Sequence, residues 1–263
     1  MDHVERDGVR LACAEYGGDG PPVMLLHGLA GYAGEWAETA SWLTASHRVF
    51  APDARGHGES ERFPPDVSRA AHVADVELWL EHFGIEQAVL VGQSLGGHTA
   101  FLVAAHRPDL ISGVIVAEST PAAGPRARAD MKHWLESWPV PFRSREAALA
   151  FFGGDTLRGR AWVDGLEACA DGLRSRFDDD VMLASLEEVV TRDYWQEWES
   201  VRCPALVVRA GNGVPRHLAL WMIERQPNAT LVEIDDAGHD LHLEQPGRWR
   251  EAVQTFLLQE ATS

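Results

Sequence analysis

The sequence predicts an α/β fold: a mostly parallel central sheet of about eight strands, with helices on both faces and a helical insertion. Three observations lead to this prediction. Short continuous apolar runs, typical of strands buried on both faces, alternate with segments of helical period. Gly- and Pro-rich breakers separate the two kinds of segment. The alternation stops between about residues 121 and 200 and then resumes.

The first half of the chain begins with a hairpin and continues through four buried strands. Two short extended runs within residues 3–16 flank Asp7-Gly8, a dipeptide that supplies the positive φ angles of a tight turn. The apolar runs that follow are 23–26, 48–51, 88–91 and 113–117, and segments of helical period lie between them at 35–43, 69–83 and 95–106. Strands that alternate with helices pair in parallel through right-handed crossovers.

The second half contains the insertion and then returns to the same alternation. Residues 121–200 show several helix-like stretches and no clear buried strand, which predicts a helical lid. Strands follow at 205–208 and 230–234, and helices at 217–225 and 246–258. We therefore expect residues 1–120 and 201–263 to form the core, and residues 121–200 to form the cap or lid.

Composition and charge exclude several classes of protein. The 263 residues are 45% hydrophobic and 24% charged, which is typical of a globular chain that buries a sizeable core. The net charge of −17 repels nucleic acid and anionic membrane surfaces. No apolar run approaches the roughly 18 residues of a membrane span, and the N-terminus is not signal-like. We expect a cytoplasmic protein with a small-molecule substrate.

The cysteines and histidines indicate no metal or cofactor. Cys13, Cys169 and Cys203 lie far apart and form no C-x-x-C pattern, so they predict neither a disulfide framework nor a thiolate zinc site. His239-x-x-His242 lacks further ligands at a recognisable spacing. We expect the protein to work without a cofactor.

The strongest chemical signal is Gly92-Gln93-Ser94-Leu95-Gly96-Gly97, which joins a predicted strand to a predicted helix. A serine at the apex of such a turn has a strained backbone, so the residues two positions before and after it must be nearly free of side chain. Gly92 and Gly96 meet this requirement. A Walker loop requires a lysine after its last glycine, and a dinucleotide loop requires G-x-G-x-x-G. The segment therefore predicts a nucleophilic Ser94 rather than a phosphate-binding loop.

Together with this turn, three further segments resemble the α/β-hydrolase superfamily. They are His27-Gly28-Leu29-Ala30-Gly31, which is similar to the family's oxyanion loop, Asp53-Ala54-Arg55-Gly56-His57-Gly58-Glu59-Ser60, which is similar to its D-x-R-G-H-G-x-S segment, and Ala237-Gly238-His239, which is similar to its catalytic-histidine turn. The four motifs occur in the family's order and cover nearly the whole chain. The resemblance implies a lidded serine hydrolase.

His239 is the predicted general base. A serine hydroxyl needs a base that later protonates the leaving group, and imidazole titrates in the suitable range. His239 follows the last predicted strand, at the edge of the sheet where the Ser94 turn opens. His242 is the alternative, and we expect it to pack against the start of the last helix. We expect His27 and His57 to orient backbone.

The oxyanion formed when Ser94 attacks needs preorganised backbone donors. The N–H of Leu95, directly after the serine, is one of them by geometry. We expect the second to be the N–H of Leu29, because Gly28 and Gly31 beside it let the backbone approach a ligand.

The triad acid departs from the usual pattern of the family. In most members it follows the strand predicted here at 205–208, but the loop 209–215 contains no carboxylate. No Asp or Glu occurs between Glu199 and Glu224, so a shift of one residue cannot supply the acid.

Glu118 is the predicted acid instead, because it ends the preceding core strand at the edge where open α/β sheets bind ligands. Its placement resembles a minority of the superfamily, such as zearalenone-type lactone hydrolases. Asn212, as a neutral orienting amide, is the alternative. We expect Asp240 to point away from His239, and Asp53 to fix the loop that follows it.

These residues predict a serine hydrolase that cleaves a carboxylic ester or lactone through a Ser94–His239–Glu118 triad and an acyl-enzyme. Aromatic residues in or beside the lid favour an apolar or aromatic substrate: they are Trp134, Trp138, Phe142, Phe151, Phe152, Trp162, Phe177, Trp195 and Trp198. Two alternatives remain. The same site can serve a cofactor-free oxygenase, a perhydrolase or a C–C bond hydrolase, or the fold can be a non-catalytic ligand-binding module.

Overall fold

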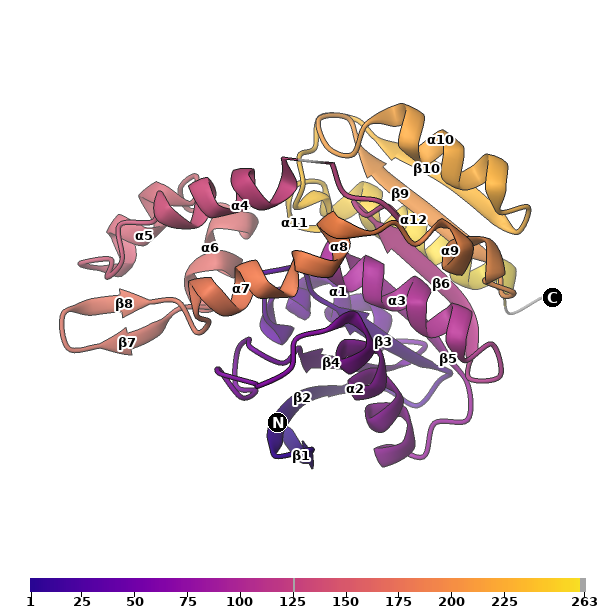
Figure 1. The fold of residues 1–263 in the computed structure, drawn as a ribbon, viewed down its shortest axis with the longest axis horizontal. Helices are drawn as coiled ribbons and strands as arrows, with labels where there is room; N and C mark the ends of the chain where they lie inside the picture. Colours follow the sequence, from indigo (N-terminus) through magenta and orange to yellow (C-terminus); the bar gives the residue numbers. More distant parts are fainter. Residues whose placement is uncertain (125, 261–263) are drawn as a thin grey trace.

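A computed structural model describes residues 1–124 and 126–260 and contains an eight-stranded sheet in the order β1-β2-β4-β3-β5-β6-β9-β10 (Figure 1). Its strands are β1 (Asp2–Arg6), β2 (Val9–Gly17), β3 (Pro22–Leu26), β4 (Arg48–Asp53), β5 (Ala88–Gln93), β6 (Ile111–Ala117), β9 (Ala205–Ala210) and β10 (Ala229–Ile234). β2 pairs antiparallel with β1 and β4, and every other neighbouring pair is parallel. The predicted mostly parallel sheet is confirmed.

The hairpin between β1 and β2 forms at the predicted dipeptide. Arg6 pairs with Val9, which leaves a two-residue loop at Asp7 and Gly8. Their φ angles are 53° and 76°, so both residues adopt the left-handed backbone that a type I′ turn requires.

Helices cover both faces of the sheet. They are η1 (Ala33–Trp36), α1 (Ala37–Leu43), α2 (Arg69–His82), α3 (Leu95–His106), α10 (Arg216–Arg225), α11 (Leu241–Glu244) and α12 (Pro246–Glu260). Successive residues of a strand point to opposite faces. Met24 and Leu26 therefore pack with α2, α3 and α10, whereas Val23 and Leu25 pack with α1 and α12. Within the described residues, every helix is too short or too polar to span a lipid bilayer.

The segment between β6 and β9 is largely helical, as predicted. It contains α4 (Ala127–Glu136), α5 (Arg145–Phe151), α6 (Leu157–Asp164), α7 (Asp179–Ser185), α8 (Glu187–Thr191) and α9 (Trp195–Ser200). It also contains a short hairpin of β7 (Glu167–Cys169) and β8 (Gly172–Arg174), which the sequence analysis did not identify. Three-residue strands are too short to show a period of two, so no pattern marks them.

The inserted segment packs on the loops that follow two central strands. Leu29 and Leu95, which follow β3 and β5, belong to the same buried cluster as Leu135 and Trp138 of the insertion. Figure 1 shows α4, α5, α6 and α7 gathered beside one end of the sheet. This packing places part of the insertion against Leu29 and Leu95, the two predicted oxyanion residues.

Asp53, at the end of β4, fixes two loops near that end of the sheet. Its Oδ1 accepts the N–H of Ala33 at 2.6 Å, and its Oδ2 accepts the N–H of Glu59 at 2.8 Å. Its carbonyl accepts the hydroxyl of Ser60 at 2.6 Å. These bonds agree with the structural role expected for Asp53.

Candidate active site

Ser94 lies at the apex of a strained turn between β5 and α3. Its φ and ψ angles are 52° and −119°, a conformation that costs energy for a residue with a side chain. Its N–H donates to the carbonyl of Ala117 at 2.8 Å. A Cβ at Gly92 would overlap the backbone of Gly96, and a Cβ at Gly96 would overlap the carbonyl of Leu26. Glycine is therefore required on both sides of Ser94.

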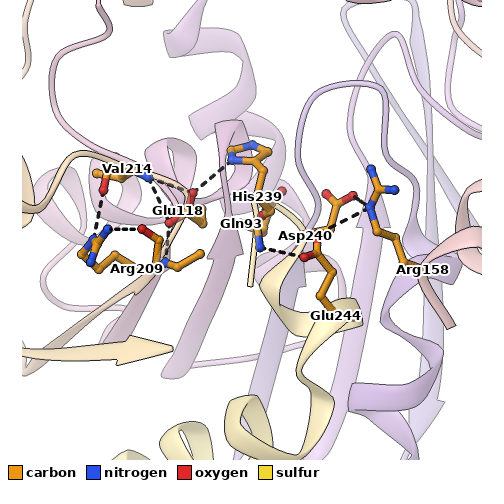
Figure 2. Close-up of polar contacts among 11 residues, drawn as sticks. Gln93, Glu118, Arg158, Arg209, Val214, His239, Asp240 and Glu244 are labelled. Carbon is orange, nitrogen blue, oxygen red and sulfur yellow. Dashed lines mark hydrogen bonds and ion pairs between the residues drawn. The ribbon is translucent and has the colours of Figure 1, made fainter. Parts of the chain in front are cut away.

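Glu118 directly follows β6, and its carboxylate is anchored by backbone groups at and after the end of β9. Its φ of 50° is left-handed, and its side chain is fully buried. Oε1 accepts the N–H of Ala210 at 2.7 Å, and Oε2 accepts the N–H of Val214 at 3.0 Å (Figure 2). These two bonds fix the position of the carboxylate.

The loop after β9 contributes space and N–H groups rather than an acid. A Cβ at Gly213 would overlap the carboxylate of Glu118, so only glycine leaves room for that carboxylate. Asn212 is exposed, and its N–H donates to the carbonyl of Ala237 at 3.1 Å. The carboxylate beside the imidazole of His239 is that of Glu118.

His239 lies in the loop between β10 and α11. Its Nδ1 is 3.3 Å from Oε2 of Glu118, and its carbonyl accepts the side-chain amide of Gln93 at 2.8 Å (Figure 2). Surrounding protein lowers the pKa of His239, but the hydrogen bond to Glu118 and the charges of Asp240, Glu118 and Glu244 outweigh this effect. The pKa of His239 therefore lies above its ordinary value. The imidazole itself is 56% exposed.

The other histidines near the site have structural contacts. His242 is buried with its ring 4.5 Å from that of Trp36, and its Nε2 lies 3.4 Å from a carboxylate oxygen of Glu35. Nε2 of His27 accepts the N–H of Ala54 at 3.0 Å. These contacts agree with the structural roles expected for the two histidines.

His57 orients the loop that contains Leu29. Its Nε2 accepts the N–H of Ala30 at 3.1 Å, and its Nδ1 lies 2.9 Å from the carbonyl of Arg55. Burial lowers the pKa of His57 to about 3, so the ring is neutral and can accept a hydrogen bond. Ala30 has a left-handed φ of 63°, which bends the chain directly after Leu29.

Two adjoining cavities open at Ser94 and His239. The larger has a volume of about 540 Å³ and the smaller about 310 Å³. Both are lined by Leu29, Ser94, Ala127, Asp130, Met131 and His239. Leu95 lines the larger cavity, so the two predicted oxyanion donors belong to residues around one space. Two other surface hollows, of about 560 and 820 Å³, are lined by none of the predicted site residues.

The walls of the two cavities differ in chemistry. Leu186, Val189 and Leu218 give the larger one an apolar surface. The smaller one is lined by Trp134 and Trp162 of the insertion. Of the nine aromatic residues noted in the sequence, these two are among the cavity-lining residues. Trp138, Phe142, Phe152 and Phe177 instead pack in the core of the insertion, and Trp195 and Trp198 pack on the main core.

Sequence reasoning missed Gln93 and Arg158 near His239, and it noted Trp162 only as an aromatic residue of the lid. Gln93 was treated only as part of the serine motif, although its position directly before Ser94 is a usable signal. Arg158 and Trp162 both donate to Asp240, which does point away from the imidazole as expected. No local pattern connects residues that lie 82 positions apart.

Among the residues that the structure describes, no three His, Cys, Asp or Glu side chains gather in an arrangement that could hold a metal ion. The candidate catalytic groups are a hydroxyl, an imidazole and a carboxylate: Ser94 and His239 line the same two cavities, and Oε2 of Glu118 lies 3.3 Å from Nδ1 of His239.

Comparison with known proteins gives consistent matches over most of the chain. A family model described as the alpha/beta hydrolase fold matches residues 21–246. The chain is 29% identical over 254 residues to the sn-1-specific diacylglycerol lipase ABHD11 of Mus musculus, covering 90% of this chain and 81% of that protein. It is 28% identical over 244 residues to N-formylmaleamate deformylase of Pseudomonas putida, covering 90% and 88%. These relatives are named as hydrolases, which supports a hydrolytic function.

A solved structure gives the same fold. The crystal structure of E-2-(acetamidomethylene)succinate hydrolase matches with a TM-score of 0.89 and 22% sequence identity, covering 97% of this chain and 98% of the other. The family match also includes the Ser94 turn, the loop after β3 and the turn that carries His239. The chain belongs to the α/β-hydrolase family.

Proposed function

We propose that this protein is a serine hydrolase that cleaves a carboxylic ester or lactone through an acyl-enzyme. The observation that carries the proposal is the placement of three side chains around one cavity. Ser94 stands on a strained turn at two cavities, His239 lines the same cavities, and Glu118 lies 3.3 Å from Nδ1 of His239. This arrangement supplies a nucleophile, a base and an orienting acid.

In the proposed reaction, the hydroxyl oxygen of Ser94 attacks the carbonyl carbon of the substrate while Nε2 of His239 takes its proton. Glu118 accepts the Nδ1–H of the imidazole, which keeps Nε2 free to act as the base. The N–H groups of Leu29 and Leu95 stabilise the tetrahedral oxyanion. His239 then protonates the leaving alcohol, and a water molecule activated by the same imidazole hydrolyses the acyl-enzyme.

The two cavities are proposed to hold the two sides of the scissile bond. They meet at Ser94 and His239, and both are lined by residues of the insertion such as Met131. We infer that residues 121–200 act as a lid over a core formed by residues 1–120 and 201–263. The leucines and valine of one cavity and the two tryptophans of the other support an apolar or aromatic substrate.

The proposal is tested by two measurements on the same preparation. A fluorophosphonate should label Ser94 stoichiometrically, and a p-nitrophenyl ester should be turned over. Ser94→Ala should abolish both. Absence of labelling and turnover in the wild type would contradict the proposal and favour a ligand-binding module. Oxygen uptake without hydrolysis would favour a cofactor-free oxygenase. A panel of aryl esters, lactones and thioesters then separates the substrate classes.

A further inference from the structure

A second polar cluster lies directly beside His239 and involves two residues of the insertion. Oδ2 of Asp240 accepts Nε–H of Arg158 at 2.7 Å and Nε1–H of Trp162 at 2.9 Å. Both donors lie on α6. The side chain of Asp240 is only 10% exposed, so water competes weakly for these bonds. An ion pair therefore joins the insertion to the residue that follows the candidate base (Figure 2).

The same cluster also reaches the residue before His239. Nε of Arg158 lies 3.5 Å from Oε1 of Glu244, and Oε2 of Glu244 accepts the N–H of Gly238 at 2.7 Å. Gly238 and Asp240 flank His239 in the chain. The carboxylate of Glu244 thus holds the backbone before the base, and the residue after the base carries the carboxylate of Asp240. Arg158 contacts both carboxylates.

We propose that Arg158 is a positioning residue that acts through Asp240 and Glu244 to hold the His239 loop in place from the insertion. The proposal rests on the proposed function, because it assigns Arg158 a role relative to the catalytic base. Arg158 and Trp162 also line the smaller cavity. The same two residues of α6 therefore form part of the proposed substrate site and hold the loop of the base in position. A small displacement of a reacting group can lower the rate about 10²-fold.

Charged groups lie around His239 on several elements. They are Asp240 and Glu244 from its own loop and α11, Glu118 from the end of β6, Arg158 from α6, and Asp130 and Arg126 from the start of the insertion. The negative charges outnumber the positive ones, which agrees with the raised pKa of His239. Removing the charge of Asp240 should therefore lower the pKa of His239, and removing the charge of Arg158 should raise it.

A double-mutant cycle measures the positioning role. We expect Arg158→Met and Asp240→Ala each to lower kcat for a p-nitrophenyl ester at least tenfold, with a smaller change in KM. The kcat of the double variant should lie within about twofold of the kcat of the less active single variant, because both changes remove the same contact. Arg160→Met is the matched control, since Arg160 also lies on α6 but pairs with Asp155 on the surface at 2.8 Å. It should keep kcat within twofold of the wild type.

A pH profile separates this role from simple support of the fold. Asp240→Asn keeps an acceptor oxygen for Arg158 and Trp162 but removes the charge. It should move the acid limb of kcat/KM to lower pH. Arg158→Met should move that limb to higher pH. A purely structural contact would lower the Tm of the variants and leave the limb unmoved.

The outcomes distinguish this proposal from the proposed function. If the wild type is labelled at Ser94 and turns over, additive losses in the double variant or an unmoved acid limb overturn only the role of Arg158. If the wild type is neither labelled nor active, both proposals fail. Should Arg158→Met lose its cooperative thermal transition, Asp240→Ala tests the same contact from its other side. An unchanged kcat in that variant would overturn the proposal.

Discussion

Replacing Glu118 with Gln tests the proposed triad most directly, because the two side chains have nearly the same shape. The carboxylate accepts the backbone N–H groups of Ala210 and Val214 and lies beside Nδ1 of His239. A carboxamide has only one acceptor oxygen. If that oxygen keeps the shortest of these bonds, the 2.7 Å bond from Ala210, it also stays 3.2 Å from the N of Val214, and the NH₂ group faces His239. The NH₂ group and the Nδ1–H of the imidazole are then two donors that oppose each other.

The imidazole can relieve its part of this conflict by moving its proton from Nδ1 to Nε2. Nδ1 of His239 then accepts from the amide of residue 118, but Nε2 can no longer accept the proton of Ser94. Loss of the orienting carboxylate in a serine triad costs about 10⁴-fold in kcat. We expect Glu118→Gln to lower kcat by about 10³- to 10⁴-fold, which corresponds to about 4 to 5.5 kcal/mol of transition-state stabilisation. KM should change little.

The assay is hydrolysis of p-nitrophenyl butyrate at pH 8.5, together with the rate of fluorophosphonate labelling at Ser94. Both rates should fall in parallel, while circular dichroism shows an intact fold. Asn212→Ala is the control, because Asn212 is exposed, and it should stay within about threefold of the wild type. A Glu118→Gln enzyme that keeps more than a tenth of the activity would refute the reasoning. A larger loss in Asn212→Ala would transfer the orienting role to Asn212.

Three further predictions follow from the same geometry. Gly213→Ala should lower kcat at least tenfold in the ester assay, because the new Cβ overlaps the carboxylate of Glu118 and must displace it. Arg55→Met should cost about 3–5 kcal/mol in urea unfolding, because it leaves the buried carboxylate of Asp75 without the two 2.6 Å bonds of the guanidinium. The acid limb of kcat/KM should lie above pH 6.5, because Glu118 and neighbouring carboxylates raise the pKa of His239 and only the neutral ring acts as a base.

The first two of these predictions have matched controls. Gly211→Ala changes the same loop, but its Cβ would meet its nearest atom at 3.4 Å, an ordinary contact, so its kcat should stay near the wild-type value. Arg107→Met removes a surface pair with Asp109 at 2.7 Å and should leave the midpoint of urea unfolding nearly unchanged. Equal effects in either control and its partner would contradict the corresponding prediction. An acid limb below pH 6 would contradict the raised pKa of His239.

Most of the core fold is predictable from the sequence because its strands are buried on both faces. The runs at 23–26, 88–91 and 205–208 are uninterrupted apolar segments, and the structure places a strand at each. The turn at Asp7-Gly8 is predictable for a different reason, since its φ angles suit few other residues. The hairpin of β7 and β8 was missed because three partly exposed residues carry no pattern.

The residues around the candidate site are also of two kinds: some are marked by a local sequence pattern, and others depend on packing between distant segments. Gly92 and Gly96 mark the turn of Ser94 because local backbone geometry requires glycine at both positions. A requirement of this kind can be recognised from a few neighbouring residues in the sequence. The contacts of Asp240 with Arg158 and Trp162 depend on how α6 packs against a loop far along the chain. Single-sequence periodicity contains no information about that packing.

The position of Glu118, the lack of a carboxylate in the loop after β9 and the glycine at 213 are connected by the pairing of β6 and β9. β6 and β9 pair in parallel with Ala117 opposite Val208, so the residues that follow the two strands emerge side by side, about 4.8 Å apart. A carboxylate from either strand can therefore approach the same imidazole. When the acid comes from β6, the neighbouring loop must leave room for it and supply N–H donors, and Gly213 and Val214 do so. Gly213 and Val214 thus provide the room and the donor with which the Glu118 carboxylate lies beside the imidazole of His239.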